Sequence, residues 1–531
     1  MTIREMIQYY LTIVTGVHHY LKTPVDTKPE TVLQDQLEHR EERWLNTVGQ
    51  VVFEEPNHPY QKMFSLAGCT YDDLGNSVRQ EGLEATLLSL RNSGVYLTHD
   101  ELKGKTPIVR SGQEIQSDKT SFDNPAVKRG VQTTSGGSRS EGTKITVGTS
   151  CRLHWDAYYQ YNIRALDLSE RIQMQVKPVL PAGAGLGCCI SYTRLGCPVK
   201  KWYAFGGPLK DSAHFRILTH LVVLVARLHG VRAPFPVHLT RNDFSAAAML
   251  IAEMRRQGHL SAVGCFTSPA VRIVSAALDR GLDIRDTLFM VSGEALTGAK
   301  RELIESAGCQ VFSRYHIAEV GPVGYGCRSM NTGNCVHLFN DSVAAINYRQ
   351  LAPLSEVEVN SLQFTTLLPA AAKILINADM DDVGNIEPAG CDCLWARSGF
   401  NRKISNIHSV GKLTGYGMSL VGTEIVRILE ERLPAQFGGS PADYQLVEIE
   451  GKSETQLVLR VSPRIKDCST TEVSDFFLKE IRACYAGRLA SRVWKHADAL
   501  QVTQAEPLVT PSGKVLPLQL LRSSPDNPYA A

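Results

Sequence analysis

A stretch near residue 140 carries residue types that suit the binding of an anion. TTSGGSRSEGTK, from Thr133 to Lys144, combines hydroxyls, three glycines and a lysine. Glycines let backbone amides approach an anion without side-chain obstruction, while hydroxyls and a lysine add donors and charge. Surface linkers often have the same composition, so this stretch alone leaves an anion-binding loop and a plain linker both open.

The P-loop of nucleoside triphosphatases does not match this stretch. That motif requires GxxxxGK followed by Ser or Thr at the start of a helix. Gly137 and Gly142 have the required separation, but Thr143 precedes Lys144 and the following ITVG has the character of a strand. The sequence therefore argues against a P-loop.

Two further stretches hold charged side chains that could take part in catalysis or ligand binding. In EPLVTPSGKVLPLQLLR, Pro511 and Gly513 predict a turn that presents Lys514, although a lysine in a terminal segment is commonly just solvated. In YHIAE, Tyr315 precedes Glu319 by four positions. A core aromatic and a solvated carboxylate are the ordinary alternative for that pair.

Five cysteine and histidine residues in two clusters could bind a metal. CDC supplies Cys391 and Cys393, and GCRSMNTGNCVHLFND supplies Cys327, Cys335 and His337. Zinc prefers four sulfur and nitrogen ligands in a tetrahedron, and a site closed by protein groups is structural. Cys335 competes with His337, because alternate residues of an extended segment point to one face. Reduced, partly buried cysteines are the alternative.

Composition limits the function classes. The chain has 531 residues, with 56 basic and 54 acidic side chains and no long basic run, which argues against a general nucleic-acid binder. Thirteen cysteines in a chain without an export signal indicate reduced thiols, and Cys188 and Cys189 are interpreted as ordinary core residues. The longest strongly apolar run, LVVLVA at 221–226, is too short for a membrane span, so we expect a cytoplasmic protein without a membrane segment.

The pattern along the chain predicts an α/β protein of more than one unit. From residue 242, helical segments alternate with short apolar runs, which is typical of βα units in a parallel sheet. YQLVEIEGKSETQLVLRVSP predicts two strands around a turn, followed by a helix, as in a small α+β domain. Residues 1–120 read as a mixed helix and loop region, and GKLTGYGMSLVG at 411–422 as a hinge. The predicted domains are a large one at 1–409, with mixed and parallel sheets, and a small mobile one at 410–531.

From about residue 57 onward, these motifs and their order resemble the adenylate-forming superfamily of acyl-CoA synthetases, within it the phenylacetate-CoA ligase-like branch. TSGGSRSEGTK resembles its phosphate loop, departing from it at Arg139 and by an apparent insertion. TPSGKV closely matches the superfamily's C-terminal lysine motif, so the resemblance gives Lys514 the role of the adenylation lysine.

The resemblance also implies roles in nucleotide binding. Tyr315 would lie against adenine, Glu319 would help hold Mg²⁺, and Asp382 in MDDVG would bind ribose, with Asp381 and Asp379 as lesser candidates. His316 replaces a glycine beside the acyl pocket, and Ala318 replaces a threonine expected to touch the α-phosphate. The implied nucleotide-binding set is Thr134, Ser135, Gly136, Gly137, Ser138, Gly142, Thr143, Lys144, Gly293, Glu294, Tyr315, His316, Ala318 and Asp382.

Zinc ligands follow from the same resemblance. The phenylacetate-CoA ligase-like branch often carries a Cys/His cluster, and HLFND at 337–341 is similar to its HisIleTrpGluAsp-like segment. The predicted ligands of a structural zinc ion are Cys327, His337, Cys391 and Cys393.

The resemblance implies an ATP-dependent, Mg²⁺-dependent ligase. It would adenylate an aryl or acyl carboxylic acid, release pyrophosphate, and pass the acyl group to coenzyme A or a carrier protein. Three alternatives stay open: an amine as acceptor, nitrite activated for diazotisation, and a zinc-stabilised nucleotide-binding protein without catalysis. The acyl pocket is expected among residues 235–243, 264–269 and 292–315, where Phe266 and His238 are candidates, and a homodimer is one expected assembly.

Overall fold

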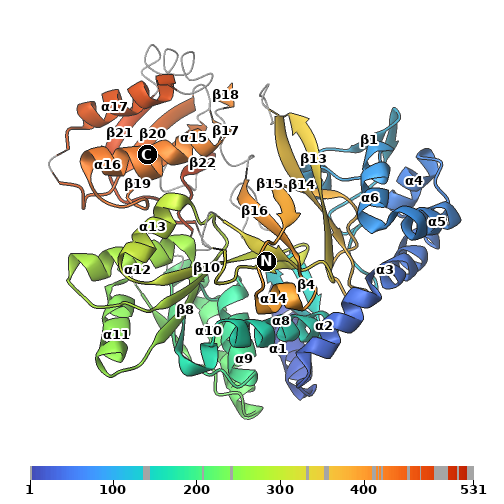
Figure 1. Cartoon of the computed structure of the whole chain (residues 1–531), viewed down its shortest axis with the longest axis horizontal. Helices are drawn as coiled ribbons and strands as arrows, with labels where there is room; N and C mark the ends of the chain where they lie inside the picture. Colours follow the sequence, from blue (N-terminus) through green and yellow to red (C-terminus); the bar gives the residue numbers. More distant parts are fainter. Residues whose placement is uncertain are drawn as a thin grey trace.

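The computed structural model describes most of the chain. It covers residues 3–522 apart from 129, 135–143, 206–208, 240–242, 331–333, 352–357, 410–413, 416–417, 420–421, 451–454, 467, 484–499 and 511–513. In the described part, a large mixed sheet forms the body and a smaller four-stranded sheet forms a separate C-terminal unit (Figure 1). The predicted fold class, α/β with a small α+β unit at the C-terminal end, is confirmed.

The body is built on a twelve-stranded sheet with a parallel and an antiparallel half. The parallel half runs in the order β10 (Gln310–Ile317), β9 (Leu288–Ser292), β8 (Ser261–Phe266), β5 (Ile172–Val176), β6 (Val199–Ala204) and β7 (Pro236–His238). The antiparallel half continues from β10 through β11 (Gly321–Tyr325), β12 (Val336–Leu338), β16 (Arg402–Ser409), β15 (Ala378–Pro388), β14 (Glu358–Thr366) and β13 (Val343–Leu351).

Helices cover both faces of the parallel half, which explains its apolar strands. One face packs on α8 (Thr149–Ala165), α9 (Ala184–Arg194) and α10 (Leu209–Leu228), and the other on α11 (Ser245–Arg256), α12 (Thr267–Asp279) and α13 (Gly298–Ser306). Side chains alternate along β9: Met290 packs with the first group of helices, and Phe289 and Val291 with the second. The predicted βα alternation is confirmed.

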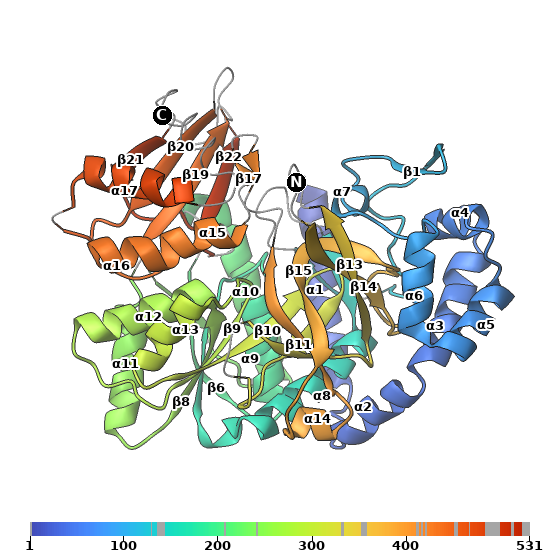
Figure 2. The same ribbon diagram turned by 45° about the horizontal axis from the view of Figure 1, so that its top comes forward.

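The N-terminal region is mainly helical. It holds α1 (Ile3–Lys22), α2 (Pro29–Glu38), α3 (Arg40–Val48), the π-helix Gly49–Phe53, α4 (Pro59–Leu66), α5 (Tyr71–Glu81), α6 (Leu83–Asn92), α7 (His99–Leu102) and a hairpin of β1 (Ile108–Arg110) and β2 (Gln113–Ile115). Helices α3 to α6 share a hydrophobic core with β13, β14 and β15, and lie beside those strands in Figure 2. Strands β3 (Gly130–Thr134) and β4 (Lys144–Gly148) form a second hairpin, directly before α8.

The C-terminal unit has its own core. Its sheet order is β21 (Leu500–Gln504), β20 (Thr455–Val461), β19 (Tyr444–Glu450) and β22 (Leu518–Arg522), packed with α15 (Gly422–Arg427), the π-helix Ile428–Arg432, α16 (Leu433–Phe437) and α17 (Thr470–Ala483). The predicted hairpin is the antiparallel pair of β19 and β20. In the hinge stretch, β17 (Thr414–Gly415) pairs with β18 (Met418–Ser419), while Gly411 and Gly417 lie outside the described residues. The boundary at 409/410 stays a prediction.

A buried ion pair joins the C-terminal unit to the body. Lys300 Nζ on α13 lies 2.8 Å from Glu430 Oε1, and their side chains are only 4% and 2% exposed. Thr297 Oγ1, just before α13, donates to the other oxygen of Glu430 at 2.5 Å. Since both charges are shielded from water, this pair favours one arrangement of the two units.

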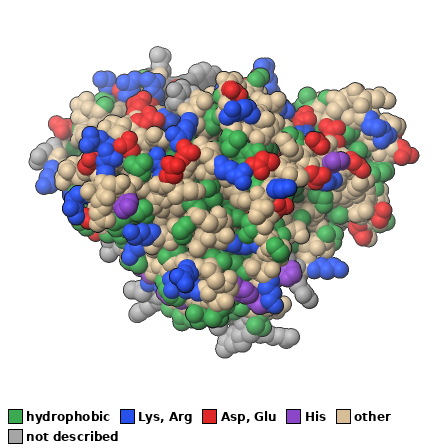
Figure 3. All heavy atoms as spheres, turned by 60° about the horizontal axis from the view of Figure 1, so that its bottom comes forward, with side chains coloured by type: hydrophobic (Ala, Val, Ile, Leu, Met, Phe, Trp, Pro, Cys, Tyr) green, Lys and Arg blue, Asp and Glu red, His purple; other side chains and the backbone are tan. Residues whose placement is uncertain are grey.

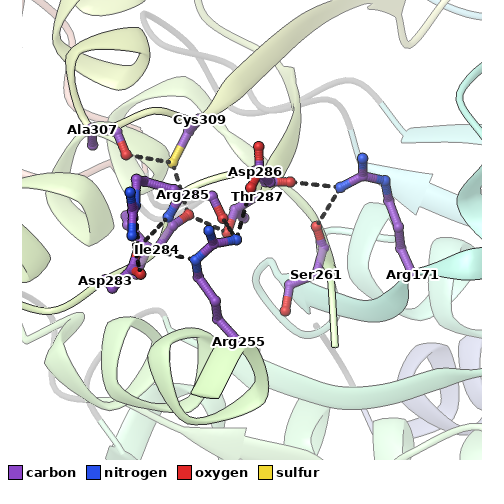
Figure 4. Close-up of polar contacts among 10 residues, drawn as sticks. All are labelled: Arg171, Arg255, Ser261, Asp283, Ile284, Arg285, Asp286, Thr287, Ala307 and Cys309. Atoms are coloured by element: carbon purple, nitrogen blue, oxygen red, sulfur yellow. Dashed lines mark hydrogen bonds and ion pairs between the residues drawn. The ribbon is translucent and has the colours of Figure 1, made fainter. Parts of the chain in front are cut away.

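Polar contacts tie together the loops at the amino ends of β8 and β9 (Figure 4). Arg171 donates to the backbone oxygen of Asp286 at 2.6 Å, and Arg255 donates to the Asp286 carboxylate at 2.8 Å. Cys309 Sγ donates to the Ile284 carbonyl at 3.2 Å. These contacts lie at the amino ends of the strands, opposite the carboxyl edge, and they hold the neighbouring strands in register.

The surface drawn in Figure 3 carries basic and acidic side chains intermixed, as the near balance of charge suggests. No helix among the described residues is long and apolar enough to cross a membrane.

Gly324 on β11 allows a close approach to β12, the strand that carries His337. A Cβ at Gly324 would lie 2.0 Å from the backbone oxygen of His337. We expect Gly324→Ala to force the two strands apart and to lower the free energy of unfolding by about 1–3 kcal/mol, measured by urea denaturation. Gly298→Ala is the matched control, because Gly298 begins α13 and a Cβ there meets nothing within 4 Å. That change should be neutral or slightly stabilising; equal losses for both variants would contradict the steric argument.

Candidate functional site

The carboxyl ends of four parallel strands lie at one level of the sheet. Phe266 at the end of β8 and Arg314 on β10 are both in register with Ser292 at the end of β9. Val176, the last residue of β5, is in register with Cys265. Open α/β sheets bind ligands at this edge, so side chains placed here are the first candidates for a functional site.

Lys514 extends from the C-terminal unit to this edge. Its Nζ lies 5.7 Å from the ring centroid of Phe266. Gly293 has a φ of +78°, and a Cβ there would lie 3.1 Å from Lys514 Cε, so the absence of a side chain leaves room for the lysine. Thr510 and Lys514 are hydrogen-bonded to each other, since Thr510 N donates to the Lys514 carbonyl at 2.9 Å and Lys514 N donates to Thr510 Oγ1 at 3.0 Å. The predicted lysine therefore lies against the body.

Glu294 holds the segment that carries Lys514. Its carboxylate accepts hydrogen bonds from Ser268 N at 2.8 Å, Ser268 Oγ at 2.5 Å and Val515 N at 3.2 Å. Removal from water raises the pKa of Glu294, although Lys300, the bonds from Ser268 and the charge of Lys514 oppose that rise. The Glu294 carboxylate thus links Lys514's segment to the start of α12, and its predicted contact with the nucleotide stays a prediction.

Tyr315 and Asp382 come together from β10 and β15. The Tyr315 hydroxyl donates to Asp382 Oδ2 at 2.7 Å. Asp379, a lesser ribose candidate, accepts bonds from Ser361 and Gln350 at 2.9 Å each and has a structural role. Asp381 has a φ of +60° and lies 3.3 Å from His99 Nδ1. Of the three aspartates, Asp382 is the one bonded to the tyrosine of the YHIAE stretch.

His316 and Ala318 continue along β10. A register shift in the pairing of β10 with β11 falls between Tyr315 and His316. The His316 ring is exposed and makes an edge contact with Trp155, at 5.3 Å between ring centroids. Surrounding protein, followed by the positive charges of Arg314, Lys177 and Lys514, lowers its pKa, which keeps the imidazole neutral near pH 7. Ala318 packs against the core around Trp155.

Glu319, the predicted Mg²⁺ ligand, is paired with a lysine that the motifs did not indicate. Lys103 Nζ contacts Glu319 Oε1, and the two side chains are 14% and 5% exposed. Lys103 follows α7 in the N-terminal region. No local signal connects residues this far apart in sequence, because the contact depends on how the N-terminal helices pack on the sheet.

The predicted phosphate loop connects β3 and β4. Thr134 and Lys144 are cross-strand partners at the ends of this hairpin. The remaining predicted contacts of the loop lie outside the described residues: Ser135, Gly136, Gly137, Ser138, Gly142 and Thr143. Their role stays a prediction.

Cys327, His337, Cys391 and Cys393 converge, with their four ligand atoms within 4.8 Å of one another. Sulfur–sulfur distances are 3.9 Å for Cys327–Cys391 and 3.7 Å for Cys391–Cys393, and His337 Nε2 lies 3.5 Å and 3.1 Å from the sulfurs of Cys391 and Cys393. Zn–S bonds of about 2.3 Å in a tetrahedron separate sulfurs by about 3.8 Å, so the donor set fits zinc. Cys335 is not part of this group.

The second nitrogen of His337 supports the same geometry. Nδ1 lies 2.7 Å from the Phe400 carbonyl oxygen, which fits a protonated Nδ1 and leaves Nε2 unprotonated toward the cysteines. Metal-binding histidines are commonly oriented in this way.

Other residues at the edge were missed in the sequence. Ser268 at the start of α12 was not singled out, and only its bonds to Glu294 reveal its role. Cys188 is a core residue as expected, and its sulfur also accepts a hydrogen bond from the buried ammonium of Lys177 at 3.3 Å. A cation directly after a strand rich in buried residues was the available signal for Lys177.

Comparisons with known proteins gave structural likeness only. No family model and no curated protein sequence matches the chain. It is similar to the solved structure of 2-hydroxyisobutyryl-CoA ligase in complex with 2-HIB-AMP and CoA, at 14% identity and a TM-score of 0.42, over 91% of this chain and 90% of that one. It is similar to McyG A-PCP with phenylalanyl-adenylate, at 12% identity and a TM-score of 0.41, over 84% and 72%.

A third likeness is to O-succinylbenzoate coenzyme A synthetase from Bacillus subtilis in complex with ATP and magnesium ion. The identity is 14%, the TM-score 0.38, and the match covers 81% of this chain and 80% of that one. Likeness at this level does not transfer a function, so the reasons for a function lie in the chain's own residues.

Loss of Lys103 would leave the Glu319 carboxylate in a buried position without this partner. We expect Lys103→Met to lower the free energy of unfolding by about 3–5 kcal/mol, measured by urea denaturation. Lys105→Met is the control, because Lys105 pairs with Asp100 at 2.9 Å where their side chains are 42% and 53% exposed. The control should cost at most about 1 kcal/mol; a loss for Lys103→Met no larger than this would contradict the pairing.

Proposed function

We propose that the chain is an ATP-dependent, AMP-forming ligase that adenylates a carboxylic acid and transfers the acyl group to a thiol, as in the phenylacetate-CoA ligase-like branch. The observation that carries the proposal is the position of Lys514. A lysine from the C-terminal unit lies against Gly293 at the carboxyl edge, next to the β10 stretch that holds Tyr315 and His316.

The reaction needs groups that stabilise growing negative charge. A carboxylate oxygen attacks the α-phosphorus of ATP, the bond from that phosphorus to the bridging oxygen breaks, and pyrophosphate leaves. The Lys514 ammonium is the side chain suited to stabilise the charge that grows on the phosphate oxygens. In the second half-reaction the acceptor thiol, of coenzyme A or of a carrier protein, attacks the acyl carbonyl and AMP leaves.

Other residues would position the nucleotide. Tyr315 and Asp382, already hydrogen-bonded to each other, are the proposed contacts for adenine and ribose, and the β3–β4 loop for the phosphates. Glu319 is the proposed Mg²⁺ ligand, and a bound Mg²⁺ ion would neutralise phosphate charge. To coordinate it, the Glu319 carboxylate must share or exchange its contact with Lys103.

We further propose that Cys327, His337, Cys391 and Cys393 hold a structural zinc ion. Two ligands come from β12 and the segment before it, and two from the segment between β15 and α14 (Leu394–Arg397). A zinc ion there would fix the antiparallel half of the sheet next to β10, and so the position of the YHIAE stretch.

Replacement of Lys514 tests the adenylation step. We expect Lys514→Ala to lower acid-dependent ATP–pyrophosphate exchange by about 10²- to 10³-fold without unfolding the protein, because one charged donor is lost. The substrate comes from a pyrophosphate-release screen of aryl, fatty and amino acids and nitrite, with and without coenzyme A. Lys479→Ala, an exposed lysine on α17 of the same unit, is the control. Exchange near the wild-type rate in Lys514→Ala would refute the assigned role.

Metal content tests the zinc site. Purified protein should contain one zinc ion per chain, measured by elemental mass spectrometry. Cys393→Ser should lose most of this zinc and unfold at a lower temperature. Cys335→Ser should retain the zinc, since Cys335 lies outside the four-residue group. Zinc-free wild-type protein with unchanged thermal stability would rule out a structural ion.

A further inference from the structure

A cluster of buried polar side chains lies under the carboxyl edge, on the side of the sheet that faces α8 and α9. Lys177, directly after β5, is 3% exposed, and Arg314 on β10 is 8% exposed. Lys177 Nζ donates to Cys188 Sγ of α9 at 3.3 Å. The Arg314 guanidinium donates to the hydroxyl of Tyr325 at 2.9 Å, so its close partner is a neutral phenol.

Neither cation has a carboxylate partner in the described part of the chain. The ion pairs found there include neither Lys177 nor Arg314. The nearby acid of α8, Asp156, lies 2.6 Å from an Arg194 nitrogen and accepts a bond from Tyr20 at 2.8 Å. A buried charge without a counter-ion costs several kcal/mol, so two of them need a compensating anion.

The Cys188 thiol supplies only part of that compensation. Burial alone would raise its pKa, but Lys177 and Arg314 lower the pKa of Cys188 to about 7. Even a fully ionised Cys188 thiolate would balance only one of the two positive charges, those of Lys177 and Arg314.

A buried amide in the same place is also without a partner. Gln175, two residues before Lys177 on the same face of β5, is 0% exposed. Neither its amide oxygen nor its amide nitrogen has a hydrogen-bond partner among the described residues. Gly264 on β8 gives this amide its space, because a Cβ there would lie 2.4 Å from Gln175 Oε1. An unsatisfied buried amide costs about 1–3 kcal/mol, which a polar ligand would recover.

This cluster adjoins the proposed reaction site. His316 is exposed at the carboxyl edge, and its pKa is lowered by the charges of Arg314, Lys177 and Lys514 together. Lys177 directly follows Val176 at the end of β5, and Arg314 is in register with Ser292, which precedes the Gly293 against which Lys514 lies.

We propose that Lys177, Arg314 and Gln175 form an oxyanion subsite of the acid-binding region. An ammonium, a guanidinium and an amide are the donors that bind carboxylates and other small oxyanions. The inference rests on the proposed function, in which the reacting acid lies at Lys514. The preferred substrate then carries a negative charge at this subsite, either as the second carboxylate of a diacid or because the acid is itself a small inorganic oxyanion such as nitrite.

Matched acids test this specificity in the full-length protein. Pyrophosphate release is measured with butyrate against succinate, hexanoate against adipate, benzoate against terephthalate, and with nitrite. We expect a kcat/KM at least about tenfold higher for a diacid than for its monoacid partner, or activity with nitrite alone, and these two results separate the two sources of the charge. A preference for the monoacids in all three pairs, without activity on nitrite, would overturn the subsite and leave the ligase function intact.

Lys177→Met keeps the length of the side chain and removes its charge. Replacement of a buried, unpaired charge by an apolar group should not prevent folding. We expect kcat/KM for the preferred anion to fall by about 10²-fold or more, while KM for ATP stays within about threefold. Lys200→Met is the control, an exposed lysine on the neighbouring strand β6. Equal kinetics of Lys177→Met and wild type would contradict the proposal, and Gln175→Leu gives a second, uncharged test.

Binding provides a readout if no acid releases pyrophosphate, a result that would refute the ligase function by itself. Succinate, adipate, terephthalate and nitrite are then added separately in thermal unfolding experiments. Stabilisation of wild type by one of them that is lost in Lys177→Met and kept in Lys200→Met would support the subsite. No stabilisation by any of the four anions would overturn it.

Discussion

The hydrogen bonds that Glu294 makes to Ser268 and Val515 determine where Lys514 lies. One carboxylate joins the start of α12 to the residue directly after the lysine, so a segment of the C-terminal unit is held at the end of β9. A charged donor acts on a reaction only when it is positioned to within about an ångström, and a terminal segment without such an anchor would not meet this demand. Further polar contacts join the units: the buried pair of Lys300 with Glu430, and the exposed pair of Arg464 with Asp279 at the end of α12. These polar contacts are among those that any rotation of the small unit would have to break.

The sequence was informative wherever a local pattern has one structural solution. Apolar runs between helical segments predicted the parallel strands, because strands covered on both faces have no polar side to display. The alternation of Tyr444 to Val461 predicted the hairpin of β19 and β20. The turn predicted at 511–513 lies outside the described residues, whereas Lys514 is described and lies against Gly293. Mixed sheets were predicted for the body, but not which strands pair antiparallel, since the pairing of β12 with β16 and of β13 with β14 depends on contacts between distant segments.

The sequence left both Cys335 and His337 open as the ligand that joins the cysteines in the predicted zinc site. Cys335 and His337 share a face only if the chain is extended through both, and β12 begins at Val336. The strand pairing orients His337, which places Nε2 toward Cys391 and Cys393 while Nδ1 meets Phe400. The close contact of Gly324 with the His337 backbone is part of the same constraint. None of these contacts could be inferred from spacing, although the four residues that the resemblance implied, with His337 and without Cys335, are the ones that converge.

The described side chains at the carboxyl edge leave positive charge without a carboxylate partner. Three carboxylates described there already have partners: Glu294 with Ser268 and Val515, Glu319 with Lys103, and Asp382 with Tyr315. Lys177 and Arg314 have no carboxylate partner among the described residues, so positive charge remains in a region that is largely shielded from water. A polyphosphate and an acid are the anions that the proposed reaction brings to this edge. Their binding supplies the missing negative charge, and the stabilisation is greatest where water is excluded and the dielectric constant is low.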